Sequence, residues 1–141
     1  MKRPESVLVV VHTRASEVLL LRRREPVDWW QSVTGSLEQG ETTLHAAQRE
    51  LREETGLAAD ADLEDAGIVN RFEIIDPWRA KYAPGTTHNT EHVFRLRLPA
   101  VTAIALAPDE HSELVWLPRA AAIARATSAT DRAAIATLVP E

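Results

Sequence analysis

Short runs of aliphatic residues, separated by polar turns, dominate the N-terminal part of the chain. "SVLVVVH" (Ser6–His12) and "EVLLLRR" (Glu17–Arg23) are β-branched or leucine-rich and lie on either side of "TRAS", whose residues suit a turn. The pattern therefore predicts two strands. Further extended stretches are predicted at "WQSVTG", which ends at Gly35, and at Ala66–Ile74, Glu91–Leu98 and Leu114–Leu117.

A helical period replaces the strand pattern between Thr43 and Thr55. Leu44, Ala47 and Leu51 recur at i, i+3 and i+7, which predicts one helix face packed against a core. Gly56 follows where a left-handed C-terminal cap belongs. Two more helices are predicted near the C-terminal end, one beginning at Pro118 and one from about Asp131 to Leu138.

Strands before and after helices favour an α/β protein, an α/β/α sandwich around a mixed β-sheet. The 141 residues fit one domain of ordinary size, so we expect a single domain over residues 1–141. With 45% hydrophobic and 26% charged residues the chain has the composition of a globular protein.

Composition and charge narrow the classes of function. The formal net charge of −5 argues against a general nucleic-acid surface, which needs an excess of basic residues. There is no cysteine, which excludes disulfides and thiolate metal sites and suits a reducing cytosol. The longest apolar run, "VLVVV", is too short to span a bilayer, and "MKRPES" lacks the hydrophobic region of a secretion signal. We therefore expect a cytoplasmic protein without nucleic-acid or membrane partners.

Glutamates crowd the predicted central helix. Glu50, Glu53 and Glu54 share a face roughly 100° wide, where like charges at i and i+4 cost about 0.2–0.5 kcal/mol per pair. One interpretation is a solvated face relieved by Arg49, which can pair with Glu53. The other is a site for a divalent cation, because Mg²⁺ takes carboxylate oxygens and keeps positions free for substrate phosphates. The helix residues by themselves leave both interpretations open.

The spacing of the surrounding residues is more specific. From Gly35 through Glu41 to "RELREETGL", the chain matches G-x5-E-x7-R-E-U-x-E-E-x-G-U at every position, where U is aliphatic. Such a match would arise by chance with a probability of about 10⁻¹⁰ per starting position. The sequence resembles the Nudix hydrolases. The resemblance implies a sandwich fold with the motif on a loop–helix–loop, and hydrolysis of a diphosphate linked to another moiety, with Mg²⁺ as cofactor and Mn²⁺ able to substitute.

The same resemblance assigns roles within the motif. It implies that Glu50 and Glu54 are metal ligands and that Glu53 binds metal or orients water. It also implies that Arg49 holds the glutamates in place. Glu53 is one candidate for the general base, and Glu110 in "APDEHSELVWL" is the other.

The flanks resemble a narrower group, the bacterial dihydroneopterin triphosphate diphosphatases of folate biosynthesis. "VLLLRRREPVDWWQSVTGS", "KYAPGTTHNTE" and "DEHSELVWL" carry this resemblance. It implies release of pyrophosphate to leave dihydroneopterin monophosphate, and it places a third metal-binding or catalytic carboxylate at Glu110, which on local sequence alone would be a polar turn. It implies substrate contacts at Lys2, Arg23, Thr34, Phe72, Glu73, Ile74, Ile75 and Ser128.

Several neighbouring residues have two interpretations. Of the three arginines Arg22–Arg24, we expect Arg23 alone to reach the site, because alternate residues of a strand face opposite sides. Trp29 and Trp30 suit either the core or stacking on a ring. His111 either tunes Glu110 or is solvated.

Two alternative functions remain. One is a Nudix pyrophosphatase acting on (deoxy)nucleoside triphosphates, so the small-molecule substrate is a pterin or a nucleoside triphosphate. The other is a non-catalytic Nudix module that binds a nucleotide-like ligand, which predicts lost motif glutamates, whereas all are present here. The sequence leaves the choice between a monomer and a homodimer open.

Overall fold

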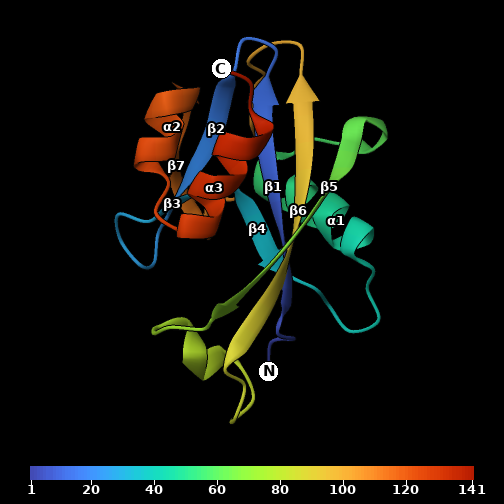
Figure 1. Cartoon of the computed structure of the whole chain (residues 1–141), viewed down its shortest axis with the longest axis vertical. Helices are drawn as coiled ribbons and strands as arrows, with labels where there is room; N and C mark the ends of the chain where they lie inside the picture. The colour runs from blue at the N-terminus through green and yellow to red at the C-terminus, as the bar shows by residue number, and fades with distance from the viewer.

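A seven-stranded mixed sheet forms the middle of the molecule, as Figure 1 shows for the computed structural model, which describes residues 1–141. Its main path runs β3-β2-β1-β6-β5, with β4 paired to β1 and β7 paired to β2. Only β1 and β6 are parallel among the paired strands. The strands are β1 (Glu5–Thr13), β2 (Glu17–Arg23), β3 (Trp30–Gln31), β4 (Val33–Ser36), β5 (Leu63–Glu73), β6 (His88–Leu98) and β7 (His111–Pro118).

Three α-helices cover the sheet, and none is long and apolar enough to cross a membrane. Figure 1 shows the pair nearest the C-terminus side by side and well apart from the first helix. The helices are α1 (Thr43–Thr55), α2 (Arg119–Arg125) and α3 (Ala129–Leu138), and two 3₁₀ turns lie at η1 (Asp60–Asp62) and η2 (Trp78–Lys81).

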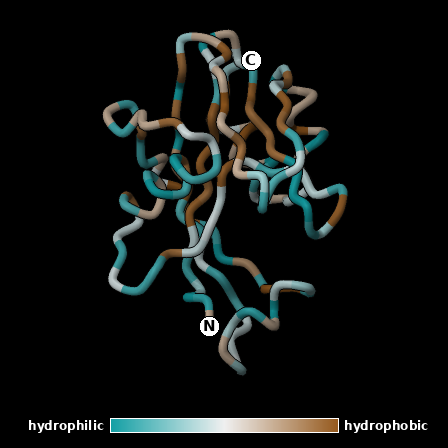
Figure 2. Tube along the Cα trace, turned by 180° about the vertical axis from the view of Figure 1, so that it is seen from behind, coloured by the Kyte–Doolittle hydropathy of each residue, from teal (hydrophilic) through white to brown (hydrophobic).

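Alternation along β1 builds two separate cores, one on each face of the sheet. Val7, Val9 and Val11 pack with the buried residues of α1, whereas Leu8 and Val10 pack with those of α2 and α3. The trace in Figure 2 is accordingly brown along the central strands and largely teal in the outer loops. The predicted α/β/α sandwich around a mixed sheet is confirmed.

One edge of β1 is shared between two partners. Strand β2 meets β1 only at His12↔Val18, while β4 pairs with the opposite end of β1, from Ser6 to Val9. The break between β3 and β4 falls at Ser32, whose amide donates to Asp131 of α3 instead of to a strand. This change of partner places β4 beside β1 in the sheet and in contact with α1.

The β5–β6 hairpin extends beyond the rest of the sheet (Figure 1). Its connection, residues 74–87, contains η2 and folds back onto the N-terminus, where the Lys2 amide donates to the Lys81 carbonyl at 2.8 Å. The hairpin therefore forms one wall of a hollow whose other walls are β4, α1 and the loop before β7.

The central helix has the predicted bounds, but its buried face differs from the predicted stripe. Leu44 is 45% exposed, whereas Ala46, Glu50 and Glu54 join Ala47 and Leu51 in the interior. The buried face is centred on Ala47 and Glu54, because the glutamates themselves point inward. The interpretation of this face as solvated is therefore wrong for two of its three glutamates.

Other boundaries shift outward by a few residues. Strands predicted to begin at Ala66, Glu91 and Leu114 begin at Leu63, His88 and His111, and the last helix begins at Ala129. Cross-strand pairing extends the strands through polar residues whose side chains show no hydrophobic pattern.

Candidate active site

Gly35 allows the glutamate helix to pack directly on β4. A Cβ atom at this position would lie 2.2 Å from the Glu50 side-chain carboxyl carbon, so only glycine leaves room for that carboxyl group. The Thr42 hydroxyl accepts the His45 amide at the start of α1, and Gly56 ends the helix in the left-handed region at φ 75°. The helix is thus fixed at both ends with Glu50 pressed against the strand.

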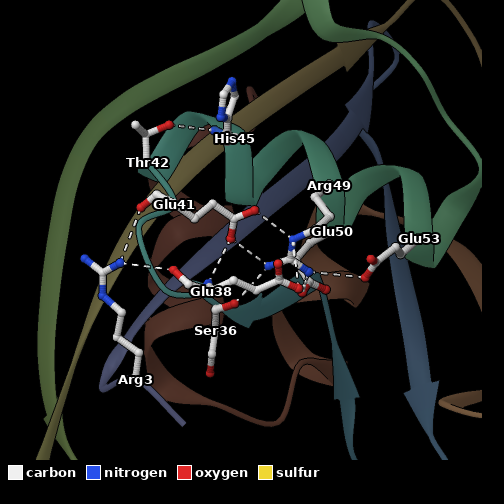
Figure 3. A network of polar contacts seen from close by, with 9 residues as sticks. All are labelled: Arg3, Ser36, Glu38, Glu41, Thr42, His45, Arg49, Glu50 and Glu53. Carbon is white, nitrogen blue, oxygen red and sulfur yellow. Dashed lines mark hydrogen bonds and ion pairs between the residues drawn. The ribbon is translucent and has the colours of Figure 1, made fainter.

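Arg49 joins the loop before α1 to the helix itself (Figure 3). Its guanidinium donates to both carboxylate oxygens of Glu41 at 2.8 and 2.9 Å, to Glu50 at 2.7 Å and to the Ser36 carbonyl at 3.0 Å. A weaker contact reaches Glu53 at 3.3 Å. Hydrogen bonding to Arg49 lowers the pKa of Glu41 to about 2, so this carboxylate stays ionised and the loop stays attached to the helix.

Glu50 and Glu54 lie one helical turn apart and are both buried. Burial raises the pKa of Glu50, and burial together with the Glu50 carboxyl group raises the pKa of Glu54 well above its ordinary value. The Oε1 atom of Glu54 is buried without a hydrogen-bond partner. An orphaned carboxylate oxygen beside a second carboxylate is an arrangement that a bound cation would stabilise.

His111 is buried next to Glu54 of this pair. Its Nε2 atom is 3.8 Å from Glu54 Oε1 and 3.4 Å from the side-chain nitrogen of Gln31. Burial, with Arg23 nearby, lowers the pKa of His111 to about 4, so the imidazole is neutral at pH 7. His111 therefore neighbours Glu54 rather than being solvated, and it adds no positive charge to the site.

The remaining candidate carboxylates are exposed at the mouth of the site. Glu53 is 54% exposed and is held by Arg49. Glu110 is exposed in the loop before β7, near enough that its charge raises the pKa of Glu54. In this structure no three His, Asp or Glu side chains are gathered closely enough to hold a metal ion, so the set Glu50, Glu54 and Glu110 is not assembled.

Arg24 holds the loop that carries Glu110. Its amide donates to the Glu110 carbonyl at 3.0 Å, and its guanidinium donates to the Pro108 carbonyl. The side chains of Arg23 and Arg24 both line the hollow, so the expectation that Arg23 alone would reach the site is wrong. Both can line it because β2 ends at Arg23 and Arg24 lies beyond the strand, where alternation no longer applies.

One cavity of about 1160 Å³ joins these groups. It is lined by every predicted site residue except Glu54, which lies beneath its surface. The predicted residues that it brings together are Lys2, Arg23, Thr34, Arg49, Glu50, Glu53, Phe72, Glu73, Ile74, Ile75, Glu110 and Ser128.

Positive charge gathers beside the glutamates. Partial burial and the nearby cations of Lys81 and Arg23 lower the pKa of Lys2, while Glu50 and Glu110 oppose this shift. Lys2 therefore lies near two further cations and near two of the candidate carboxylates, which suits a substrate that carries several phosphate oxygens.

Aromatic rings form another part of the cavity wall. Trp29 and Trp78 both line it and meet edge to face, with ring centroids 4.7 Å apart. The Arg23 guanidinium carbon lies 5.8 Å from the centroid of Trp78. Trp30 instead packs against the core beside α2 and α3, so of the two neighbouring tryptophans only Trp29 faces the cavity.

Several cavity residues were missed by sequence reasoning. Trp78 and Lys81 belong to the hairpin connection, and only its fold back onto the N-terminus brings them to the site. Asn89, Glu91 and Asp131 are polar and at least 95% buried, and each lies in a strand or helix that also carries core residues.

Comparison with known proteins agrees with this geometry. The model of the NUDIX domain matches residues 2–138 of the chain. The chain belongs to the Nudix family. Members of this family generally need a divalent metal ion, and the chain is an enzyme that hydrolyses diphosphate bonds.

Two curated relatives carry the same name. This Nudix chain is 44% identical over 138 residues to dihydroneopterin triphosphate diphosphatase of Escherichia coli, covering 95% of this chain and 91% of the relative. It is 37% identical to the Haemophilus influenzae protein of that name, covering 95% of this chain and 86% of the relative.

Solved structures show the same fold. The E. coli dihydroneopterin triphosphate pyrophosphohydrolase superposes with a TM-score of 0.92 at 44% identity, covering 98% of this chain and 96% of that one. A Nudix hydrolase from Listeria monocytogenes superposes with a TM-score of 0.77 at 25% identity, covering 97% of this chain and 92% of that one.

The residues present fit the metal that the family requires. The candidate ligands are all carboxylates, which hard divalent cations prefer. Glu54 presents an oxygen without a partner, and Gly35 leaves the space that the Glu50 carboxyl group occupies. A bound cation would also offset the burial and the neighbouring carboxylates that raise the pKa of both glutamates.

Proposed function

We propose that this Nudix enzyme hydrolyses dihydroneopterin triphosphate to dihydroneopterin monophosphate and pyrophosphate. The observation that carries the proposal is the single cavity, which joins the buried glutamate pair and the cations to an aromatic wall large enough for a fused heterocycle. The likeness to the E. coli diphosphatase over nearly the whole chain supports the same substrate.

We propose Glu50, Glu54 and Glu110 as the ligands of Mg²⁺, with Mn²⁺ able to substitute. When bound, the ion would supply charge neutralisation at the diphosphate and acidify a water molecule. The buried pair Glu50 and Glu54 comes from one rigid helix, whereas Glu110 comes from a loop on the other side of the cavity, so its side chain must turn inward to join them.

The chain's own cations position the phosphates. Lys2 and Arg23 lie beside the carboxylates, and the guanidinium of Arg23 can hold two phosphate oxygens at once. Arg49 is occupied by Glu41 and Glu50 and is therefore a positioning residue for the glutamates. Thr34, the stretch Phe72–Ile75 and Ser128 complete the wall that contacts the rest of the substrate.

Glu110 is the better candidate for the base that receives a proton from water. Glu53 is ion-paired with Arg49 at 3.3 Å, so its carboxylate is already engaged with the guanidinium. Glu110 makes no ion pair within 4 Å and lies at the cavity mouth, where water has access. Either role, ligand or base, makes Glu110 necessary for turnover.

Replacement of two neighbouring acids tests this assignment. Glu110→Ala should lower kcat by about a hundredfold or more while changing KM little, because the group acts in the transition state. Asp109→Ala is the matched control, since Asp109 lines the same cavity, and it should retain kcat within about twofold. Steady-state kinetics with both purified variants measure this. If Asp109→Ala lowers kcat and Glu110→Ala does not, Asp109 is the catalytic carboxylate. If neither substitution changes the kinetics, Glu53 is the better candidate for the base.

The substrate is tested by direct comparison. Dihydroneopterin triphosphate and the standard nucleoside triphosphates should be assayed side by side for pyrophosphate release, with Mg²⁺, with Mn²⁺ and with a chelator. The proposal expects the highest kcat/KM for the pterin with Mg²⁺ and none with the chelator. A higher kcat/KM for a nucleoside triphosphate would make the protein a nucleotide pyrophosphatase instead.

A further inference from the structure

Two buried polar side chains on β6 line the cavity and have no assigned role. Asn89 and Glu91 are 3% and 5% exposed, and both face the α3 side of the sheet, as does Val93. Neither is hydrogen-bonded to Arg49 or to the acidic loop, and Glu91 makes no ion pair with a basic side chain within 4 Å. Burying a carboxylate without a cationic partner is costly unless other groups supply hydrogen-bond donors to it.

Asn89 keeps one hydrogen-bonding group unused. Its side-chain nitrogen donates to the Ser6 hydroxyl at 2.8 Å, which fixes the orientation of the amide. Its side-chain oxygen is buried and has no partner. An acceptor left unpaired at a cavity wall costs free energy unless a donor on a ligand reaches it.

Glu91 also has accepting capacity left. Its Oε1 atom accepts the Asn70 side-chain nitrogen at 3.2 Å, and the Thr130 side chain is near enough to act as a second donor. A carboxylate can accept about four hydrogen bonds, so two positions remain. Asp131, by contrast, has both oxygens bonded to Ser32 at 2.7 Å and holds α3 against the sheet.

A planar ring has a place next to these acceptors. Phe72 is the cross-strand partner of Asn89, so their side chains project from neighbouring positions on one face of the sheet. Phe72 lines the cavity with Asn89 and Glu91. An aromatic face beside two buried acceptors matches a flat heterocycle whose edge carries N–H donors.

We propose that Glu91 and Asn89 accept hydrogen bonds from the N–H groups along one edge of the pterin ring and thereby determine the selectivity for the heterocycle. This inference rests on the proposed function. The pyrimidine half of a pterin carries a ring N–H beside an exocyclic amino group. Glu91 accepts the ring N–H and one amino hydrogen, as a carboxylate does with two adjacent donors, and Asn89 accepts the other amino hydrogen. The triphosphate then extends toward Lys2 and Arg23, on the side of the glutamate helix.

The test replaces one acceptor and compares ligands with and without the ring. Glu91→Gln keeps the shape of the side chain but turns one acceptor into a donor. It should raise KM for dihydroneopterin triphosphate about tenfold or more, with kcat nearly unchanged. The inhibition constant of inorganic tripolyphosphate, which has phosphates but no ring, should not change. Asn89→Leu should act in the same direction, since it removes the second acceptor.

Matched controls separate recognition from folding. Glu64→Gln makes the same substitution on β5 at an exposed position outside the cavity, and it should leave all constants unchanged. The affinity for free dihydroneopterin, measured by calorimetry in the presence of a chelator, gives a second readout that needs neither metal nor phosphate. The unmodified protein should bind it, and Glu91→Gln should bind it about tenfold more weakly.

The outcomes distinguish this inference from the proposed function. If the unmodified protein turns over dihydroneopterin triphosphate and Glu91→Gln alters neither its KM nor binding of the free pterin, the inference is wrong and the function stands. Parallel losses for the pterin and tripolyphosphate also overturn it, because they indicate general damage to the site. If the unmodified protein does not turn over dihydroneopterin triphosphate, the proposed function falls and the inference falls with it.

Discussion

The absence of a single methyl group at Gly35 determines how close the glutamate helix comes to the sheet. The Glu50 carboxyl group occupies the space that any other residue at position 35 would fill. A glycine beside a site can serve either a tight turn or the close approach of a side chain to the backbone, and Gly35 has the second use. Sequence alone could not distinguish these uses, because Glu50 meets Gly35 only after the helix folds back.

Gly35→Ala should therefore damage the site more than the fold. The added Cβ atom must displace the Glu50 carboxyl group, and a displacement near 1 Å can cost about a hundredfold in rate. Gly67→Ala is the control, because Gly67 has φ 72° but nothing lies within 4 Å of its added Cβ atom. It should lower the melting temperature through backbone strain and leave kcat intact. Full activity in Gly35→Ala would show that Glu50 can move without consequence.

At the scale of elements, both ends of helix α1 were predicted at the correct residues, whereas the face that it buries was not. Thr43–Thr55 is bounded by a side-chain cap and a glycine, which are local signals that sequence carries well. The buried face differed from the prediction, because buried glutamates break the rule that hydrophobic residues mark the interior. Local chemistry thus specified the helix, while tertiary packing specified which side chains it buries.

Arg49→Lys tests how far α1 depends on its attachment to the preceding loop. Lysine lacks the planar fork that contacts Glu41 twice while also reaching Glu50 and the Ser36 carbonyl. We expect kcat to fall about tenfold or more. The pKa of Glu41, measured by NMR titration, should rise from about 2 toward its ordinary value of 4.5.

The control for this change lies on the same helix. Arg52 is exposed and its only ion pair, with Asp60, is 3.9 Å long, so Arg52→Lys should alter neither kcat nor the pKa of Glu41. If Arg49→Lys shifts the pKa of Glu41 but leaves kcat unchanged, the contacts of Arg49 fix the loop before α1 but are not needed for catalysis.

At the scale of the whole molecule, the cavity lies where parts far apart in the sequence meet. Its walls come from the N-terminus, the end of β2, β4, α1, the β5–β6 hairpin, the loop before β7 and the start of α3. The site residues expected from the motif and its flanks all line this cavity, except Glu54, which lies directly beneath it. Asn89, Glu91 and Asp131 could not be expected from the sequence, because each occupies an ordinary position in its own element and reaches the cavity only through the packing of α3 on the sheet.

Asp131 links the stability of this packing to pH. Burial raises the pKa of Asp131 from 3.8 to about 6 despite its hydrogen bonds to Ser32. The folded protein thus holds this proton more tightly than the unfolded chain, and the free energy of unfolding should fall as pH rises from about 4 to about 6. The full change is about 3 kcal/mol.

Urea denaturation between pH 4 and pH 7 measures this dependence. Asp131→Asn cannot ionise, so its free energy of unfolding should fall less over this range than that of the unmodified protein. Asp65→Asn, at an exposed position on β5, should follow the unmodified profile. Coincident profiles for the unmodified protein and Asp131→Asn would show that Asp131 does not ionise in this range.

The parallel pairing of β1 with β6 has a consequence for how the chain folds during synthesis. Nine residue pairs, from Glu5↔Thr90 to Thr13↔Leu98, join positions 85 residues apart at the centre of the sheet. The ribosome must therefore release most of the chain before the first strand finds its neighbour, and contacts of such long range slow folding. Until then β1 presents an unpaired, valine-rich edge to other chains, and an unpaired edge of this kind favours aggregation during synthesis.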